Sequence, residues 1–234
     1  MTTLTRTLAA MILPIVFTGC ASTAMRDPSD PLEPMNRKIF AFNQTVDDAA
    51  LKPLAKGYRA ITPTPVQTAV RNVFSNLDDV TEFANNLLQF KVQAATSDLL
   101  RISVNSTFGL LGLIDIASEM RLPKHNEDFG QTLGRWGIKS GPYLVLPILG
   151  PSSVRDGTGI LVDSNYFDPV YQISHIPTRD AVLGFKLIAR RADLLDAQSI
   201  IDQAALDKYL FTRDIYLERR QAMVYDGNPP DTDE

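Results

Sequence analysis

An uncharged segment from Ser140 to Val154 limits the folds open to this chain more than any other feature. Its sequence, SGPYLVLPILGPSSV, is mostly apolar and is interrupted by three prolines and two glycines. A helix that crosses a bilayer needs roughly 20 consecutive apolar residues, so this segment is too short and too broken to do so. Irregular backbone is tolerated at membrane depth only where it is buried in protein or lines a cavity. We therefore expect the segment in one of those two settings.

The sequence on both sides of this segment has the spacing of amphipathic helices. Two prolines open residues 31–50, after which apolar residues recur at helical intervals. Another helix is predicted to start after Pro65. In the C-terminal third, Thr178 is predicted to cap a helix whose apolar stripe reaches Leu195, and a last helix is predicted over 206–223. These patterns predict a mainly α fold of amphipathic helices around a Gly- and Pro-rich centre.

The single cysteine, Cys20, ends an N-terminal stretch that has the layout of a secretory signal. Arg6 is followed by an apolar run and then by small residues. The last four residues, FTGC, resemble the bacterial lipobox, in which the leader is cut before the cysteine and the thiol is acylated. A buried free thiol is the alternative. Acylation would tether the protein to a membrane, and Ala21 in place of the Asp typical of inner-membrane retention points to the outer membrane.

The chain is accordingly predicted to have four parts. Residues 1–19 form a leader that is removed, 20–30 an acylated tether, 31–225 one helical domain, and 226–234 a disordered acidic tail. The formal net charge of −4 argues against binding to nucleic acid or to anionic lipid by charge alone. With one cysteine, no disulfide can support the fold.

Residues that would carry catalysis or hold a metal do not form a recognisable set. His125 and His175 are the only histidines and are interpreted as surface or loop residues. The sequence has no G-x-S-x-G elbow and no phosphate loop. Four carboxylates in the middle of the chain are interpreted as helix caps or salt-bridge partners: Asp115, Asp128, Asp156 and Asp163. We therefore expect neither a cofactor nor an enzymatic activity.

Four segments together resemble the MlaA/VacJ family of outer-membrane lipoproteins. They are DPLEPMNRKIFAFN (30–43), NVFSNL (72–77), FGLLGLIDIA (108–117) and EDFGQTLGRWGIKSGPYLVLPILGPSSVRD (127–156). The resemblance implies a ring-shaped, monotopic body in the inner leaflet of the outer membrane. Phospholipids that have strayed into the outer leaflet would pass through its amphipathic channel to a periplasmic carrier protein. The family also associates with trimeric porins.

Two groups of residues are the candidate functional sites. Part of the channel wall, or of a ridge beside it, is predicted to consist of Tyr143, Leu144, Leu146 and Leu149, with packing in the core as the equal alternative. The turn at Phe42 and Asn43 is a candidate gate, because the resemblance places it in the opening helical region beside the channel.

Two other functions remain open on the sequence. The first is a membrane-tethered lipid hydrolase, which would need a nucleophile and an activating base within reach of each other. The second is a structural lipoprotein that braces the envelope or a porin.

Overall fold

The computed structural model describes residues 27–28 and 30–230. The predicted leader, Cys20 and the last four residues of the predicted tail lie outside this part of the chain. Within it the fold is mainly helical, as predicted, with a two-stranded sheet near the middle of the sequence.

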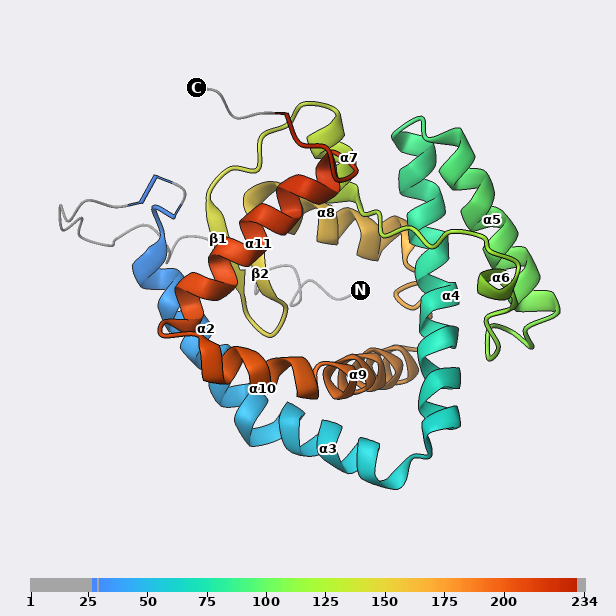
Figure 1. Ribbon diagram of the computed structural model, residues 1–234, viewed down its shortest axis with the longest axis horizontal. Helices are drawn as coiled ribbons and strands as arrows, with labels where there is room; N and C mark the ends of the chain where they lie inside the picture. The colour runs from blue at the N-terminus through green and yellow to red at the C-terminus, as the bar shows by residue number, and fades with distance from the viewer. Residues whose placement is uncertain (1–26, 29, 231–234) are drawn as a thin grey trace, which may run out of the picture.

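The first helices follow one another without a loop. Helix α2 (Glu33–Val46) continues into the π-helical segment η1 (Asp47–Leu51), which leads into α3 (Lys52–Ile61). Pro53 lies at the start of α3, and because it has no N–H to donate, the regular α-helical ladder cannot continue through this point. The result is a curved arc along one side of the molecule (Figure 1).

A long antiparallel helix pair follows the arc. Helix α4 (Thr64–Leu88) begins two residues before the predicted start, and α5 (Val92–Thr107) packs along its outer side (Figure 1). Phe90, with φ of 60°, turns the chain between the two helices. Two short helices come next, α6 (Ile116–Glu119) and α7 (Phe129–Arg135).

The uncharged segment forms a β-hairpin. Strand β1 (Tyr143–Leu146) pairs antiparallel with β2 (Gly150–Ser153), with Tyr143 opposite Ser153. At the hairpin turn, Ile148 has a φ of 66°, in the left-handed region that β-branched residues rarely adopt. Helix α8 (Val154–Val162) starts directly after β2.

The C-terminal third is helical, with boundaries that correct two predictions. The elements are η2 (Asp163–Phe167), α9 (Ile176–Asp193), α10 (Leu195–Ala204) and α11 (Lys208–Val224). Thr178 lies inside α9, because His175 is the N-cap residue and Pro177 occupies the first turn. The last helix begins after Leu206, since the Asp207 carboxylate caps it by accepting hydrogen bonds from the backbone N–H groups of Tyr209 and Leu210.

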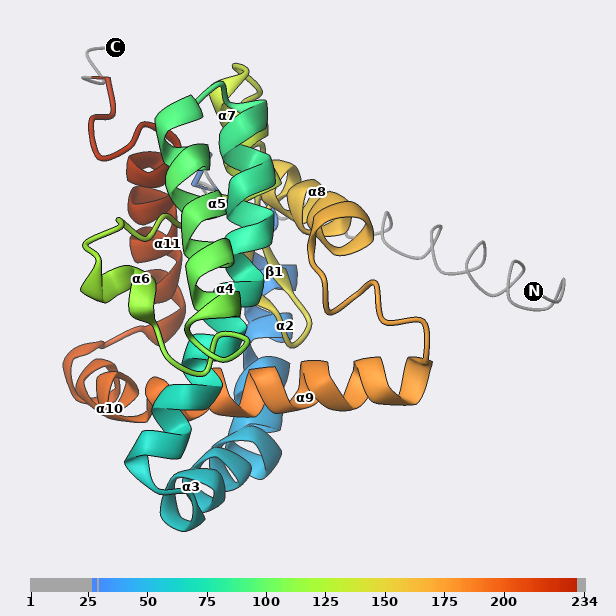
Figure 2. The same cartoon turned by 90° about the vertical axis from the view of Figure 1, so that its right-hand side faces the viewer.

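The hairpin lies between α2, α8 and α11, while α9 crosses the molecule beneath it and projects beyond the other helices (Figures 1 and 2). A small aromatic core of Tyr143, Val145 and Tyr209 joins β1 to α11. The ring shape implied by the family resemblance stays a prediction.

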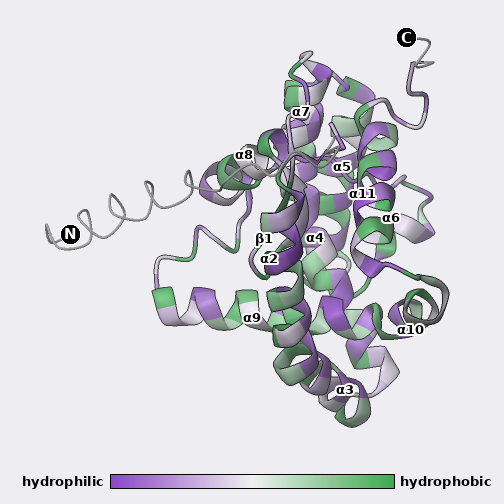
Figure 3. Ribbon diagram, turned by 90° about the vertical axis from the view of Figure 1, so that its left-hand side faces the viewer, coloured by the Kyte–Doolittle hydropathy of each residue, from purple (hydrophilic) through white to green (hydrophobic). Residues whose placement is uncertain are grey.

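None of the described helices combines the length and the apolar composition needed to cross a bilayer. Hydrophobic and hydrophilic residues alternate along α3 and α9 in the hydropathy colouring (Figure 3). These two helices are therefore amphipathic.

Candidate functional site

The site is organised around the free edge of β1, which two asparagines of α2 hold in place. Asn36 is fully buried, and its side-chain amide bonds to one carbonyl and one N–H group of the β1 backbone. Its Nδ2 donates to the carbonyl of Tyr143 at 3.0 Å, and its Oδ1 accepts from the N–H of Val145 at 2.9 Å. Nδ2 also donates to Asp30 at 2.8 Å, which fixes the orientation of the amide. A single side chain thus takes the place of a neighbouring strand.

Asn43 repeats this arrangement at the hairpin turn. Its Nδ2 donates to the carbonyl of Leu146 at 2.9 Å, and its Oδ1 accepts from the N–H of Ile148 at 2.8 Å. The structure therefore brings one candidate gate residue into direct contact with one candidate wall residue. Both gate candidates lie within α2, so the predicted turn at these residues is wrong, and Phe42 is half exposed. The two hydrogen bonds of Asn43 attach the turn of the hairpin to α2.

The four candidate wall residues divide between the core and the surface. Tyr143 is fully buried, with its ring centroid 5.8 Å from that of Tyr216 and 6.2 Å from that of Tyr209. Burial, together with the nearby Asp30 carboxylate, raises the pKa of Tyr143 to about 12. Its side chain supports the hairpin from the core.

The other three wall candidates are accessible from outside. Leu144 and Leu146 are half-buried and lie on the face of β1 opposite Tyr143 and Val145, because side chains alternate along a strand. Leu149, in the turn, is 61% exposed. These three leucines therefore form part of the apolar surface that the hairpin exposes.

A cavity of about 450 Å³ lies beside Asn43 and the hairpin turn. Its lining comes from α2, η1, α3, α9, α10 and α11, together with the turn and the start of β2. Apolar side chains such as Phe40, Leu51 and Ile148 share the lining with an ion pair, in which Arg191 contacts Asp47 at 2.6 and 2.7 Å. We call this space the hairpin cavity. Its mixed lining suits a molecule that has both polar and apolar parts.

A cluster of charged groups joins α11 to α7 and α8. The Arg220 guanidinium bonds to Asp128, at the N-cap of α7, and to Asp156 of α8 at 3.0 Å. Burial alone would raise the pKa of both carboxyl groups, but the charge and hydrogen bonds of Arg220 outweigh it and hold both values below the ordinary range. This cluster joins three helices around the strands.

The remaining carboxylates and the histidines have local structural partners. Asp115 caps α6, and Asp163 accepts hydrogen bonds from Asn85 and from the backbone of Phe129. Burial raises the pKa of Asp163 to about 6. His175 contacts Thr178 at 2.8 Å.

Of the two histidines, only the partly exposed His125 lies against a buried carboxylate, that of Asp98, in an arrangement that resembles part of a catalytic site. Asp98 Oδ1 lies 2.6 Å from Nδ1 of His125, and Ser97 lines the same pocket. However, Ser97 Oγ donates to the carbonyl of Pro123 at 3.2 Å. The serines of the GPSSV segment are fully buried, and Ser153 caps α8.

Sequence reasoning missed Asn36 and the hairpin cavity. Asn36 could have been noticed as a polar residue within the apolar pattern of α2, seven residues before Asn43 and so on the same helix face. Its partners on β1 lie more than 100 residues away, and no local pattern indicates them.

Comparison with known proteins identifies the family. A family model described as MlaA lipoprotein matches residues 28–223. The intermembrane phospholipid transport system lipoprotein MlaA of Haemophilus influenzae is 34% identical over 228 residues, which cover 94% of this chain and 90% of that protein. The protein of the same name from Escherichia coli is 32% identical over 216 residues, with coverages of 89% and 84%.

A solved structure agrees with these relatives. It comes from work on the structural basis for maintenance of bacterial outer membrane lipid asymmetry, and it matches with a TM-score of 0.74 and 30% identity over 84% of this chain and 99% of that chain. The resemblance found in the sequence is confirmed, and the chain belongs to the MlaA lipoprotein family.

Proposed function

We propose that this protein is the outer-membrane lipoprotein of an intermembrane phospholipid transport system. It removes mislocalised phospholipids from the outer leaflet through an amphipathic channel and passes them to a periplasmic carrier. The relatives that carry the name of such a system, matched over most of their length, support this role. In this proposal residues 1–19 are a cleaved leader, Cys20 is the acylated anchor, 21–30 form the tether, and a trimeric porin is a partner.

The observation that carries the proposal is the distribution of polar and apolar side chains. Large apolar residues are exposed, including Phe90 at 85% and Leu111 at 78%, while Arg101, Gln131 and Asp79 are almost completely buried. Exposed apolar patches and buried polar groups are both unusual in a protein surrounded by water. A protein whose outer surface faces lipid chains would expose large apolar side chains of this kind and pair its polar groups inside.

The loop after α5 supports the same conclusion. Phe108, Leu110 and Leu111 are all more than 60% exposed, and both leucines have φ above 50°, which is uncommon for a side chain of this type. Backbone hydrogen bonds hold the turn, among them one from the N–H of Gly112 to the carbonyl of Asn105 at 2.9 Å. The fold thus maintains a strained loop that presents apolar side chains outward, which suits insertion into a leaflet.

The hairpin and its cavity are the proposed path for the lipid. The phosphate and the tails of a phospholipid need polar and apolar surroundings respectively. The hairpin cavity offers both, and Leu144, Leu146 and Leu149 provide apolar surface on the hairpin next to it. The attachment of the turn to Asn43 is the element that would move if Phe42 and Asn43 act as a gate.

The experiment is a measurement of phospholipid on the surface of cells. Deletion of the gene should raise the exposed amount, and the unmodified gene should restore it. Leu146→Asp should restore it incompletely, because a carboxylate on the apolar path opposes passage of the tails. Glu119→Gln, an exposed change elsewhere, should restore it fully. A surface that never changes on deletion would contradict the proposal.

A tethered hydrolase remains the alternative, supported by the Asp98–His125 pair. Phospholipid incubated with the purified lipoprotein should release no fatty acid. Release that disappears in Ser97→Ala and in His125→Ala would favour the hydrolase. A porin-bracing protein would instead purify with porin and without phospholipid.

A further inference from the structure

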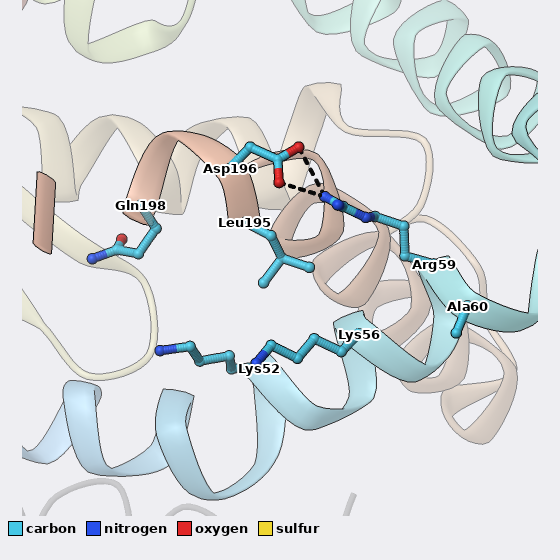
Figure 4. A pocket seen from close by; sticks show the side chains of 7 residues that line it. All are labelled: Lys52, Lys56, Arg59, Ala60, Leu195, Asp196 and Gln198. Atoms are coloured by element: carbon cyan, nitrogen blue, oxygen red, sulfur yellow. Dashed lines mark hydrogen bonds and ion pairs between the residues drawn. The ribbon is translucent and has the colours of Figure 1, made fainter. Parts of the chain in front are cut away.

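A second pocket, of about 380 Å³, lies between α3 and α10 and is rich in basic groups. Lys52 and Lys56 extend from α3 along one side, and Leu195 and Gln198 project from α10 on the other (Figure 4). An ion pair closes one end, where Arg59 Nη1 lies 3.0 Å from both carboxylate oxygens of Asp196. We call this space the lysine pocket.

The three cations of α3 lie on one face of the helix. Lys52, Lys56 and Arg59 are spaced by four and three residues, which places them side by side. Like charges at these intervals disfavour a helix unless an anion compensates them. Lys52 has a partial partner in the exposed Asp48 at 3.2 Å, but Lys56 has no ion-pair partner among the described residues. The pocket therefore has positive charge available for a ligand in a chain whose overall charge is negative.

The lysine pocket adjoins the hairpin cavity. Lys52 and Gln198 line both spaces, so the two share a boundary at these side chains. One space is basic, and the other has a mixed lining with apolar residues such as Phe40 and Leu51. An anionic group in the first and a hydrocarbon chain in the second would lie as close together as they do within one lipid molecule.

We propose that Lys52 and Lys56 bind the phosphodiester of a phospholipid, with its tails directed into the hairpin cavity. This assignment rests on the proposed function and names the part of the lipid that the protein recognises. Charge-assisted hydrogen bonds from ammonium groups to phosphate oxygens are among the strong ones in proteins. A lysine ammonium is a point charge on a flexible stem and imposes no planar geometry on its partner. The site therefore requires the phosphodiester and accepts different headgroups attached to it.

The test is a binding titration with the full lipoprotein in neutral detergent micelles. The probes are phosphatidylglycerol and phosphatidylethanolamine with a fluorescent tail, and diacylglycerol with the same tails and no phosphate. The double variant Lys52→Gln/Lys56→Gln should bind both phospholipids about tenfold more weakly, with diacylglycerol binding unchanged. The control Lys38→Gln/Lys139→Gln makes the same change in net charge at two exposed lysines that do not line the pocket, and it should bind like the unmodified protein.

Each other outcome has a distinct meaning. Equal binding by the two double variants would overturn the assignment to Lys52 and Lys56 while leaving the transport function intact. Failure of the unmodified protein to bind any phospholipid would instead contradict the proposed function itself. Inorganic phosphate at millimolar concentration should not displace the lipid. Displacement by phosphate alone would identify the free ion as the ligand and would overturn the lipid assignment.

Discussion

Asn36 and Asn43 lie two helical turns apart on α2 and hold backbone positions that are three residues apart on the hairpin. Seven residues of α-helix rise about 10.5 Å, and three residues of a strand extend about 10 Å. The two lengths match, so one helix face can satisfy a free strand edge with two amide groups. This match explains why a hairpin of four-residue strands is stable here without a third strand.

Asn43→Ala should loosen the turn of the hairpin. The N–H of Ile148 and the carbonyl of Leu146 would both lose their partner, at a cost of about 1–2 kcal/mol in the free energy of unfolding. Hydrogen exchange at the Ile148 amide should become faster, and surface phospholipid should rise in cells that carry the variant. Thr45→Ala is the matched control, because its hydroxyl bonds only to the carbonyl of Ala41 in the same helix. Unchanged exchange at Ile148 would show that Asn43 does not hold the turn.

Asn36→Ala should be more destabilising than Asn43→Ala. Asn36 is fully buried, and its removal leaves a buried N–H and a buried carbonyl on β1 without partners, at about 2–4 kcal/mol. Asn36→Asp should also destabilise, because a carboxylate cannot donate to the carbonyl of Tyr143. Denaturant titration monitored by the fluorescence of Trp136 measures both effects. Asn165→Ala serves as control, since this exposed amide bonds to the carbonyl four residues earlier in the chain. An equal loss of stability in the two variants would show that Asn36 has no special role in holding β1.

Arg220→Met should destabilise the protein by about 3 kcal/mol at neutral pH, because it leaves the buried Asp156 and the partly exposed Asp128 without their main cation. The pKa of both carboxyl groups lies below the ordinary value in the unmodified protein. The stability that Arg220 provides is therefore present above about pH 4 and lost as the pH falls further. The difference in the free energy of unfolding between the unmodified protein and Arg220→Met should therefore become smaller below about pH 4. Arg219→Met, at the exposed neighbouring position, should have little effect at any pH.

The sequence predicted the helices well because their apolar residues recur at a regular interval. It did not predict the hairpin, because strands of four residues are too short to show a clear alternation of apolar and polar residues. The prolines and glycines of this segment obscure the alternation further. For the same reason the sequence does not show that Tyr143 is buried while Leu144 is partly exposed, because only the paired strands reveal which face of β1 is buried. Thr178 was the wrong cap because a proline two residues after His175 fits the first turn of a helix that starts earlier.

The candidate site depends on contacts between distant parts of the chain. Asn43 and Leu146 were both chosen from the sequence, but their hydrogen bond spans 103 residues and needed coordinates. The lysines of α3 are visible as a helical face, whereas α10, which closes the pocket, follows more than 130 residues later.

Cys20→Ser should give a product without acyl chains. The signal layout and the lipobox predict cleavage before Cys20 and attachment of lipid to its thiol, and at least two chains are needed for firm anchoring. Mass spectrometry of the purified protein should show loss of the lipid mass, and fractionation should show loss from the membrane. A product with the mass and location of the unmodified protein would contradict the prediction.

Glu82 should make the stability of the protein fall between about pH 5 and pH 8. Burial between α4 and α5 raises its pKa to about 8, and the nearby Asp79 carboxylate adds to this against the opposing charge of Lys124. An acid whose pKa is raised on folding stabilises the folded state below its unfolded pKa, and this contribution is lost as the pH rises through the folded value. The slope can reach about 1.4 kcal/mol per pH unit.

The variant Glu82→Gln separates this effect from other titrations. Its amide resembles the protonated carboxyl group, since it can still accept from Lys124, whose Nζ lies 2.8 Å from Glu82 in the unmodified protein. The variant should be at least as stable as the protein at pH 8, and its advantage should disappear near pH 4.5. Free energies of unfolding measured across this range test the difference. Glu119→Gln, at an exposed position on α6, should reproduce the pH dependence of the unmodified protein. If Glu82→Gln does the same, Glu82 is ionised in the folded state, and Lys124 balances its charge fully.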